Sequence, residues 1–418
     1  MKEFTGWQYL LIDVANHFGL DKTTFETRIQ WAEDNLDDLE GFVIDAAEPE
    51  LFTKTVMAIR SAQRGEQTGH LVAMDAVCSG IQIMSVLTGC VEGAKATGCV
   101  NPDVRADAYH LVSVAMNAAL KAMGLADVSF PRKIVKNAVM TRMYGSEKVP
   151  ERHFGVMTPE LQAFYAACFK VAPGASVLLD ELLGTWKPYA LIHEWTLPDG
   201  FEAKVKVMKT VIEEGIEVDE LDHASFTYEY RVNEGKETGK SNAANVVHSV
   251  DAYLLRSLLR RCSYDEEGVS RISALVSAEL LERASTGFSG HPDFADVDTW
   301  SHVLRFKATR MADTVILPYL NPMTVKALST THLQMLNRIM HMMLERKPCD
   351  VVTIHDSFAS HPNHVNTVRY WYKELLAELA DSEVLSDLMN QLHSCVGYYS
   401  KRSQNLGAMI RKSNYALS

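Results

Sequence analysis

The sequence predicts an α+β protein that is mostly α-helical. Apolar side chains recur at helical spacing over most of the 418 residues, whereas period-two alternation is concentrated in one region after Trp195. Two further strand-like runs, at 71–74 and 351–354, are short, and an aspartate follows soon after each. With 47% apolar and 22% charged residues, the chain can bury a large core, which we expect to be divided into two or three subdomains.

The first half of the chain is predicted to be almost entirely helical. Residues 7–19 place apolar side chains on one helical face, and Gly19 is a suitable C-terminal stop. A strand that runs directly into a helix is expected at 71–88, because the apolar run there stops at Asp75 and a helix-like segment follows. Further helices are expected from about residue 25 and at 104–123, 129–144 and 159–171.

The second half is predicted to begin with a β-hairpin. Pro198, Asp199 and Gly200 form a turn signal, and residues 203–207 and 225–232 both alternate between apolar and polar side chains. We therefore expect one hairpin at about 201–232, then a polar loop, then a helix over 245–256. Residues 263–325 show scattered helical stretches to which the sequence assigns no function.

Composition argues against membrane and disulfide-rich classes. No apolar run is long enough to span a bilayer, and the N-terminus lacks the hydrophobic region of a signal peptide. The seven cysteines are odd in number and include no Cys-x-x-Cys pair, which argues against a disulfide framework and a zinc ribbon. These features predict a soluble cytoplasmic protein without a membrane partner.

The charge distribution is uneven. A net charge of −12 disfavours a nucleic-acid binder, because affinity for phosphates comes from clustered Lys and Arg. Acidic residues gather at 33–50 and 213–222, and we expect a second polypeptide to supply further positive surface. One basic island stands out, formed by Arg132, Lys133, Lys136, Arg142 and Lys148.

Two aspartates, Asp75 and Asp356, are candidate metal ligands. An Asp after an apolar strand is most often a turn or helix-capping residue. Two such residues, with a cationic helix between them in the sequence, favour a metal site, because Mg²⁺ takes oxygen ligands and usually only one or two protein carboxylates. Two Mg²⁺ ions held there would activate an attacking hydroxyl and neutralise a leaving pyrophosphate.

The cationic helix is predicted over 129–144. Ser129 is a plausible N-cap, and Pro131 is tolerated in a first turn. A single row at four-residue steps is formed by Arg132, Lys136, Met140 and Tyr144. In an ordinary helix this pattern would be a solvated basic face. The aromatic ring beside Gly145 at its end instead favours a row that lies along a triphosphate and beside a sugar.

Three segments together resemble motifs A, B and C of the bacteriophage-type single-subunit RNA polymerases. Residues 75–82 are similar to motif A, 132–145 to motif B and 355–358 to motif C, and segments 19–22 and 245–249 also resemble parts of this family. The likeness covers nearly the whole chain. It implies a right-hand polymerase fold, related to the family A DNA polymerases, with a palm built on a small antiparallel sheet and helical fingers.

The resemblance also implies roles for individual residues. Asp75 and Asp356 would hold both Mg²⁺ ions, with the carbonyl of Ala76 as a further ligand. Tyr144 and His248 would select a ribose 2′-hydroxyl. The incoming triphosphate would be bound by Lys22, Arg132 and Lys136. The implied reaction is attack of an RNA 3′-hydroxyl on the α-phosphate of a ribonucleotide, directed by a DNA template.

The resemblance further implies a domain division and partners. Residues 1–65 would form a helical palm insertion, 66–95 and 249–418 the palm with a helical insertion at about 263–325 and a C-terminal foot, and 96–248 the fingers, with the hairpin at 201–232 in the place of a promoter-specificity loop. Family members carry a large N-terminal domain that is expected to be lacking here. The chain is therefore expected to be the catalytic subunit of a split phage enzyme in the host bacterial cytoplasm. Its expected partners are the DNA template, nascent RNA, nucleoside triphosphates, a second subunit with that domain, and a recruiting single-stranded-DNA-binding factor.

Two alternatives remain open at this point. A family A-like DNA polymerase would share the metals and the cationic helix, but there a glutamate usually stands at the positions of Gly80 and Ser357. An inactive structural subunit of a transcription complex would have no physical reason to retain Asp75, Asp356 and the cationic row together.

Overall fold

The computed structural model describes residues 1–418 and is mostly helical, with small antiparallel sheets. The α+β class and the predominance of helix agree with the sequence prediction. None of the helices is both long and apolar enough to cross a lipid bilayer. The helices are α1 (Gly6–Ala15), α2 (Phe25–Asp34), α3 (Pro49–Gln63), α4 (Ser79–Thr88), α5 (Val91–Ala96), α6 (Ala108–Ala122), α7 (Arg132–Arg142), α8 (Lys148–Phe154), α9 (Pro159–Val171), α10 (Pro173–Leu183), α11 (Ser241–Cys262), α12 (Glu266–Thr286), α13 (Val297–Thr309), α14 (Thr330–Arg346), α15 (Val365–Asp381), α16 (Val384–His393) and α17 (Leu406–Ile410).

The central sheet has three antiparallel strands in the order β1-β7-β6. They are β1 (Val72–Asp75), β7 (Ser357–Ser360) and β6 (Val352–Ile354). Helix α15 packs against β7, and α4 and α11 pack against α15. The side chains of Trp371 and Tyr372 on α15 are fully buried, and 95 buried residues form one contiguous core. The core therefore anchors the strands that carry both candidate aspartates.

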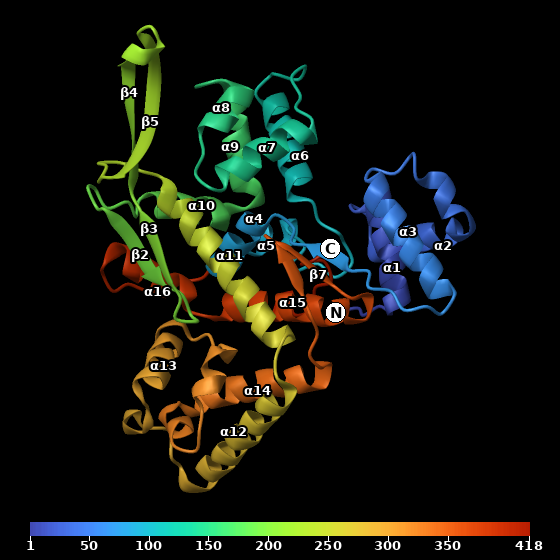
Figure 1. Cartoon of the computed structure of the whole chain (residues 1–418), viewed down its shortest axis with the longest axis vertical. Helices are drawn as coiled ribbons and strands as arrows, with labels where there is room; N and C mark the ends of the chain where they lie inside the picture. The colour runs from blue at the N-terminus through green and yellow to red at the C-terminus, as the bar shows by residue number, and fades with distance from the viewer.

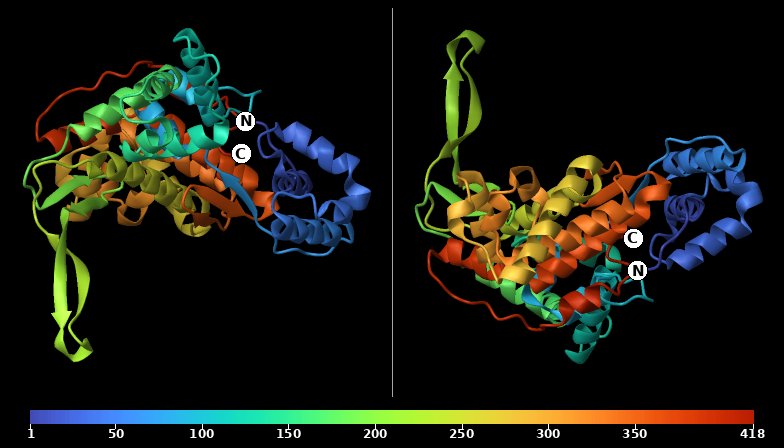
Figure 2. Two further views of the ribbon diagram at one scale, coloured as in Figure 1. Left: turned by 90° about the horizontal axis from the view of Figure 1, so that it is seen from above. Right: turned by 90° about the horizontal axis from the view of Figure 1, so that it is seen from below.

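The remaining elements surround this centre on three sides. Helices α1–α3 form a lobe beside the sheet, α6–α9 lie on one side of the core, and α12–α14 lie on the opposite side (Figure 1). A long β-ribbon projects away from the body in every view (Figure 2). The predicted helices in 263–325 are present as α12 and α13, together with short 3-10 turns.

The predicted single hairpin at 201–232 is wrong in its pairing. Strand β3 (Glu202–Lys206) pairs with β2 (Ile192–Thr196), and β4 (Met208–Val218) pairs with β5 (Ala224–Asn233). There are two hairpins because the segment before the Pro198–Gly200 turn is itself a strand. The β4–β5 ribbon is the projecting one, and six carboxylates lie between Glu213 and Asp222 around its tip.

The start of the cationic helix also differs from the prediction. The N-cap of α7 is Pro131, without a side-chain cap bond, rather than Ser129. Proline has no N–H and its fixed φ suits the entry to a helix, so it replaces a hydroxyl cap here. At the other end the helix stops at Arg142, and Tyr144 and Gly145 follow in a turn in which Gly145 has φ +87°.

Candidate active site

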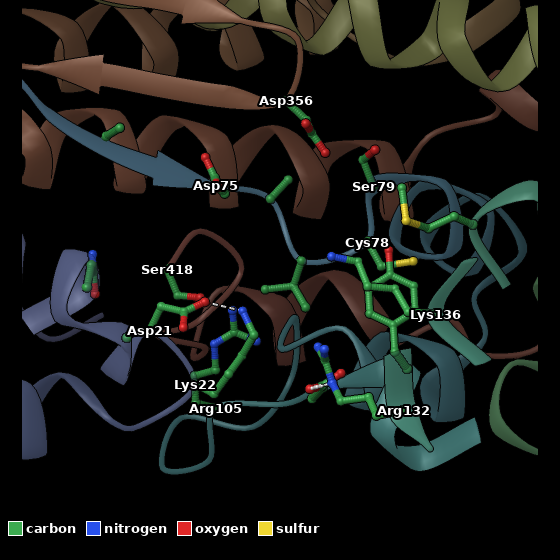
Figure 3. Close-up of a pocket in the computed structure, with 18 of the residues that line it drawn as sticks. Asp21, Lys22, Asp75, Cys78, Ser79, Arg105, Arg132, Lys136, Asp356 and Ser418 are labelled. Carbon is green, nitrogen blue, oxygen red and sulfur yellow. Dashed lines mark hydrogen bonds and ion pairs between the residues drawn. The ribbon is translucent and has the colours of Figure 1, made fainter. Parts of the chain in front are cut away.

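The two candidate aspartates come from neighbouring strands. Asp75 is the last residue of β1, and Asp356 lies in the two-residue turn between β6 and β7. In the antiparallel pairing Asp75 lies opposite Ser357, and the N–H of Ala76 donates to the carbonyl of Asp356 at 3.0 Å. Both side chains line one cavity, as Figure 3 shows. The structure therefore brings Asp75 and Asp356 together, while what they bind there stays a prediction.

Two strained backbone positions hold these loops. His355, next to Asp356, has φ 55°, and Cys78, which precedes α4, also has φ 55°. A non-glycine residue in the left-handed region costs free energy and is tolerated only where the surrounding structure enforces it. The core on α15 and α4 supplies that enforcement. His355 is a backbone turn residue here and does not line the cavity.

The cavity joins the carboxylates to cations from three separate segments. It has a volume of about 600 Å³ and opens to solvent between the N-terminal lobe, the sheet and α7. Of the site residues predicted from the sequence, His248 does not line the cavity. The other seven do: Lys22, Asp75, Ala76, Arg132, Lys136, Tyr144 and Asp356. Opposite charges thus face one another across a space of nucleotide size.

The cations of α7 are held in place by residues that sequence reasoning did not single out. Arg132 Nε donates to Asp107 at 2.6 Å. The guanidinium of Arg132 and the ammonium of Lys136 lie 5.7 and 5.6 Å from the centroid of the Tyr109 ring. Burial pushes the pKa of Asp107 upward, but its bonds from Arg132 and from the His110 N–H lower it overall. Asp107 and Tyr109 therefore fix both cations toward the cavity.

The ring of Tyr144 lies between the helix row and α4. It packs at 4.5 Å, centroid to centroid, against the imidazole of His248 on α11. A Cβ at Gly80 would lie 3.2 Å from Cζ and from Oη of this ring. Burial, helped by the nearby Asp356, raises the pKa of Tyr144 to about 12, so the phenol keeps its proton at neutral pH. Burial lowers the pKa of His248, and the nearby His355 lowers it further. The pair therefore presents a phenol and a neutral imidazole.

A third carboxylate, Asp251 on α11, lies near Asp356. Burial, together with the charge of Asp356, raises the pKa of Asp251 to about 6. Sequence reasoning missed it because its position inside a helical pattern gives no local signal. Asp107 could have been found, since it caps the predicted 104–123 helix by accepting from the His110 N–H at 3.1 Å. Sequence reasoning also did not single out Arg105, a further cation that lines the same cavity and whose pKa is lowered by burial.

Lys22 reaches the cavity from the N-terminal lobe. It follows a π-helical turn, Asn16–Leu20, in which Gly19 has φ 114°, and it forms an ion pair with Asp21. The buried guanidinium of Arg28 donates to the carbonyl of Asp21 at 2.8 Å and to Asn16 Oδ1 at 2.9 Å. These bonds set the shape of the loop that carries Lys22. Gly19 therefore permits the turn, although the α-helix itself ends at Ala15.

A grouping of three candidate metal ligands occurs elsewhere in the molecule. Glu217, Asp219 and His223 bring their ligand atoms within 4.8 Å of one another at the tip of the β4–β5 ribbon. All three are exposed, and exposed acidic clusters of this kind are common. Asp75 and Asp356 are not part of this group.

The comparisons with known proteins agree with the chemistry of this cavity. Residues 2–155 match the family described as DNA-dependent RNA polymerase. The chain is 29% identical over 175 residues to a mitochondrial DNA-directed RNA polymerase of Schizosaccharomyces pombe, covering 35% of the chain and 15% of that relative. It is 27% identical over 172 residues to the DNA-directed RNA polymerase of Pseudomonas phage phiKMV, covering 34% and 21%.

A third relative extends the similarity along most of the chain. A chloroplastic/mitochondrial DNA-directed RNA polymerase of Nicotiana tabacum is 25% identical over 375 residues, which is 75% of the chain and 34% of that relative. The chain thus spans well under half the length of the relatives it matches. The matching family and these relatives are named as DNA-dependent or DNA-directed RNA polymerases, which are nucleotidyltransferases, and the relatives include phage and mitochondrial enzymes.

Proposed function

We propose that this chain is the catalytic subunit of a DNA-dependent RNA polymerase. The observation that carries the proposal is the single cavity in which Asp75 and Asp356 face Arg132, Lys136 and Tyr144. Polymerisation needs carboxylates that hold divalent metal and cations that hold a triphosphate, and both are present on opposite walls. The low-identity similarity to phage and organellar RNA polymerases supports the same conclusion.

In this proposal the three-stranded sheet with α4, α15 and the part of α11 from residue 249 onward is the palm of a right-hand fold. Residues 66–95 and 249–418 belong to the palm and 96–248 to the fingers, with α7 as the helix that closes on the nucleotide. Residues 1–65 form a palm insertion that carries Lys22. The ribbon β4–β5, rather than the whole of 201–232, takes the position of a specificity loop.

The residues present fit a pair of Mg²⁺ ions. Asp75, Asp356 and the carbonyl of Ala76 offer the hard oxygen ligands that Mg²⁺ prefers. Burial raises the pKa of Asp251, and the charge of Asp356 raises it further; a divalent cation held by Asp356 would offset the contribution from charge. When bound, the ions lower the pKa of the attacking hydroxyl and balance charge on the departing pyrophosphate.

The chain's own side chains supply the remaining steps. Arg132 and Lys136 bind and orient the triphosphate, and Lys22 contacts it from the opposite wall. Because Asp107 and Tyr109 hold the two α7 cations in place, little reorganisation is needed when charge develops on the phosphoryl oxygens. The 3′-hydroxyl of the RNA is thereby placed in line with the α-phosphate, which is where orientation contributes most to rate.

Selection of a ribonucleotide is assigned to Tyr144 and His248. The phenol and the neutral imidazole can each exchange a hydrogen bond with a 2′-hydroxyl. Gly80 leaves room for the Tyr144 ring, whereas a glutamate there would occupy the same space. This contact disfavours the family A-like DNA polymerase alternative.

The proposal includes partners beyond the chain itself. Template DNA, nascent RNA and nucleoside triphosphates are the substrates and product. With a net charge of −12, the chain needs further positive surface to hold a duplex, so we propose a second polymerase subunit and a recruiting single-stranded-DNA-binding factor. The proposed setting is the cytoplasm of a phage-infected bacterium.

The test is extension of an RNA primer annealed to a DNA template, with Mg²⁺ and either ribo- or deoxyribonucleotides. We expect ribonucleotide incorporation by the wild-type chain, stimulated by a co-expressed partner. Asp356→Asn should abolish it, while the exposed control Glu50→Gln should not. Undiminished synthesis by Asp356→Asn would remove the metal assignment, and preferential use of deoxyribonucleotides would favour a DNA polymerase.

A further inference from the structure

Two of the parts of the chain that line the cavity are joined by a polar cluster with a buried centre. The N-terminal lobe supplies Lys22, and the sheet supplies Asp75. Between them lies a group that we call the Asp13 cluster: Asp13, His17, Glu48, Thr55 and His70. Asp13 belongs to α1 and His17 to the π-helical turn. Glu48 directly precedes α3, Thr55 lies within α3, and His70 lies just before β1.

The carboxylate of Asp13 is the centre of the cluster. It accepts from His70 Nε2 at 2.7 Å and from Thr55 Oγ1 at 3.0 Å, and His17 Nε2 lies 3.5 Å from its other oxygen. The second ring nitrogen of His17 contacts Glu48 at 2.8 Å. Asp13 on α1 therefore links α3 and the segment before β1 through noncovalent contacts that help to fix their relative positions.

Burial makes the loss of any of these hydrogen bonds costly. The side chains of Asp13 and His70 are only 3% and 4% exposed. Burial favours the neutral carboxyl, but hydrogen bonds from His17 and His70 outweigh it and lower the pKa of Asp13. Removing a donor would leave a buried anion without its partner, which is costly. A shift between the lobe and the sheet is the structural change that would relieve that cost.

The cluster lies close in sequence to both walls of the cavity. His70 lies five residues before Asp75, in the segment that leads into β1, and His17 lies five residues before Lys22, in the π-helical turn. Asp13, His17 and Glu48 themselves line the cavity on the lobe side. A displacement at the cluster is therefore transmitted over a short stretch of backbone to a phosphate-binding cation or to a metal ligand.

We propose that Asp13 and His70 are positioning residues that hold Lys22 in register with Asp75, so that one triphosphate is gripped from both walls. The inference rests on the proposed polymerase function. It predicts that disruption of the cluster acts on nucleotide binding through Lys22 and leaves the binding of the RNA–DNA hybrid unchanged.

The experiment is a double-mutant cycle on primer extension by the full chain, with KM for the nucleotide and kcat measured separately. His70→Ala is expected to raise KM for the nucleotide about tenfold, because a displaced Lys22 would lose a charge-assisted contact with the triphosphate that contributes to affinity on that order. His70→Gln, which retains a donor, should restore most of the affinity. In a Lys22→Gln background His70→Ala should have no further effect on KM, since both changes remove the same contact. His341→Gln, an exposed histidine on α14, is the control.

The outcomes separate the inference from the proposed function. If the wild-type chain does not extend the primer, either alone or with its co-expressed partner, the polymerase proposal fails and this inference falls with it. If the wild type extends the primer but the two changes are additive, or His70→Ala lowers only kcat or thermal stability, the positioning role is wrong. Should His70→Ala not fold, Asp13→Asn and Thr55→Val give the same comparison. Equilibrium binding of a non-hydrolysable ribonucleotide with Mg²⁺ and the hybrid then provides the readout without turnover.

Discussion

Gly80 controls the position of Tyr144, and its replacement by alanine tests the ribose-selection site. The added Cβ would lie 3.2 Å from Cζ and Oη of the ring, closer than an ordinary van der Waals contact. The ring must therefore move by a few tenths of an ångström, away from α4. If Tyr144 donates to a 2′-hydroxyl, this movement weakens a hydrogen bond worth about 1 kcal/mol, which corresponds to about a fivefold loss of preference for ribonucleotides.

A change in the folding stability of Gly80→Ala is not expected to alter the measured preference for ribonucleotides. Overpacking against Tyr144 typically costs about 1–3 kcal/mol, and a lower folded fraction would reduce kcat/KM for both nucleotides alike. The assay is the ratio of kcat/KM for a ribonucleotide to that for the matching deoxyribonucleotide. Gly69→Ala is the matched control, because nothing lies within 4 Å of its added Cβ.

Gly80→Ala should lower the ratio about fivefold, the same direction as Tyr144→Phe, and the double variant should resemble Tyr144→Phe alone because both act on one hydrogen bond. A wild-type ratio in Gly80→Ala alongside a reduced ratio in Tyr144→Phe would show that ring position does not matter. A ratio unchanged in both would remove Tyr144 from ribose selection.

Three further predictions concern charge in and around the core. Lys136→Gln should lower kcat/KM for ribonucleotides by about 10²-fold, as expected for loss of one preorganised charge contact, whereas the exposed Lys148→Gln should not; equal losses would mean a general charge effect. Because the pKa of Asp251 is raised to about 6, the metal-free fold binds that proton more tightly than the unfolded chain. Stability should therefore fall by about 3 kcal/mol as the pH rises from about 4 to about 6 and stay level above it. Asp251→Asn should flatten this dependence in urea unfolding, and an unchanged profile would contradict the assignment. Arg261 and Glu378 form a buried ion pair at 2.6 Å, and Glu378 has a second, longer contact at 3.4 Å with the half-exposed Arg338. Arg261→Met should cost about 3–5 kcal/mol, and adding Glu378→Leu should recover most of it; a small effect of the single change would show that Arg338 alone balances the buried carboxylate.

Sequence reasoning located the two carboxylates and the helix row because each depends on a local pattern. An apolar run that ends at an aspartate marks Asp75 and Asp356, and four-residue spacing marks Arg132 and Lys136. The strand pairing brought the two aspartates to one cavity, as expected. Their binding of Mg²⁺, and the roles of Lys22 and His248, stay predictions.

What sequence reasoning missed depends on contacts between distant segments. Tyr109 supports the α7 cations only because α6 packs beside α7, and the charge near Asp356 includes Asp251 only because α11 packs against α4 and α15. The hairpin was mispaired because strand alternation reports which face a residue takes, not which partner the strand has. In the structure β3 pairs with β2 and β5 pairs with β4, whereas β3 and β5 were expected to pair with each other.

The most direct test of the central claim is the location of Mn²⁺, as a substitute for Mg²⁺, by anomalous diffraction from crystals of the chain with an RNA–DNA hybrid and a non-hydrolysable ribonucleotide. The account predicts metal density in contact with the carboxylates of both Asp75 and Asp356, next to the triphosphate. Metal density confined to Glu217, Asp219 and His223 at the ribbon tip, with a triphosphate bound away from Lys136, would contradict it.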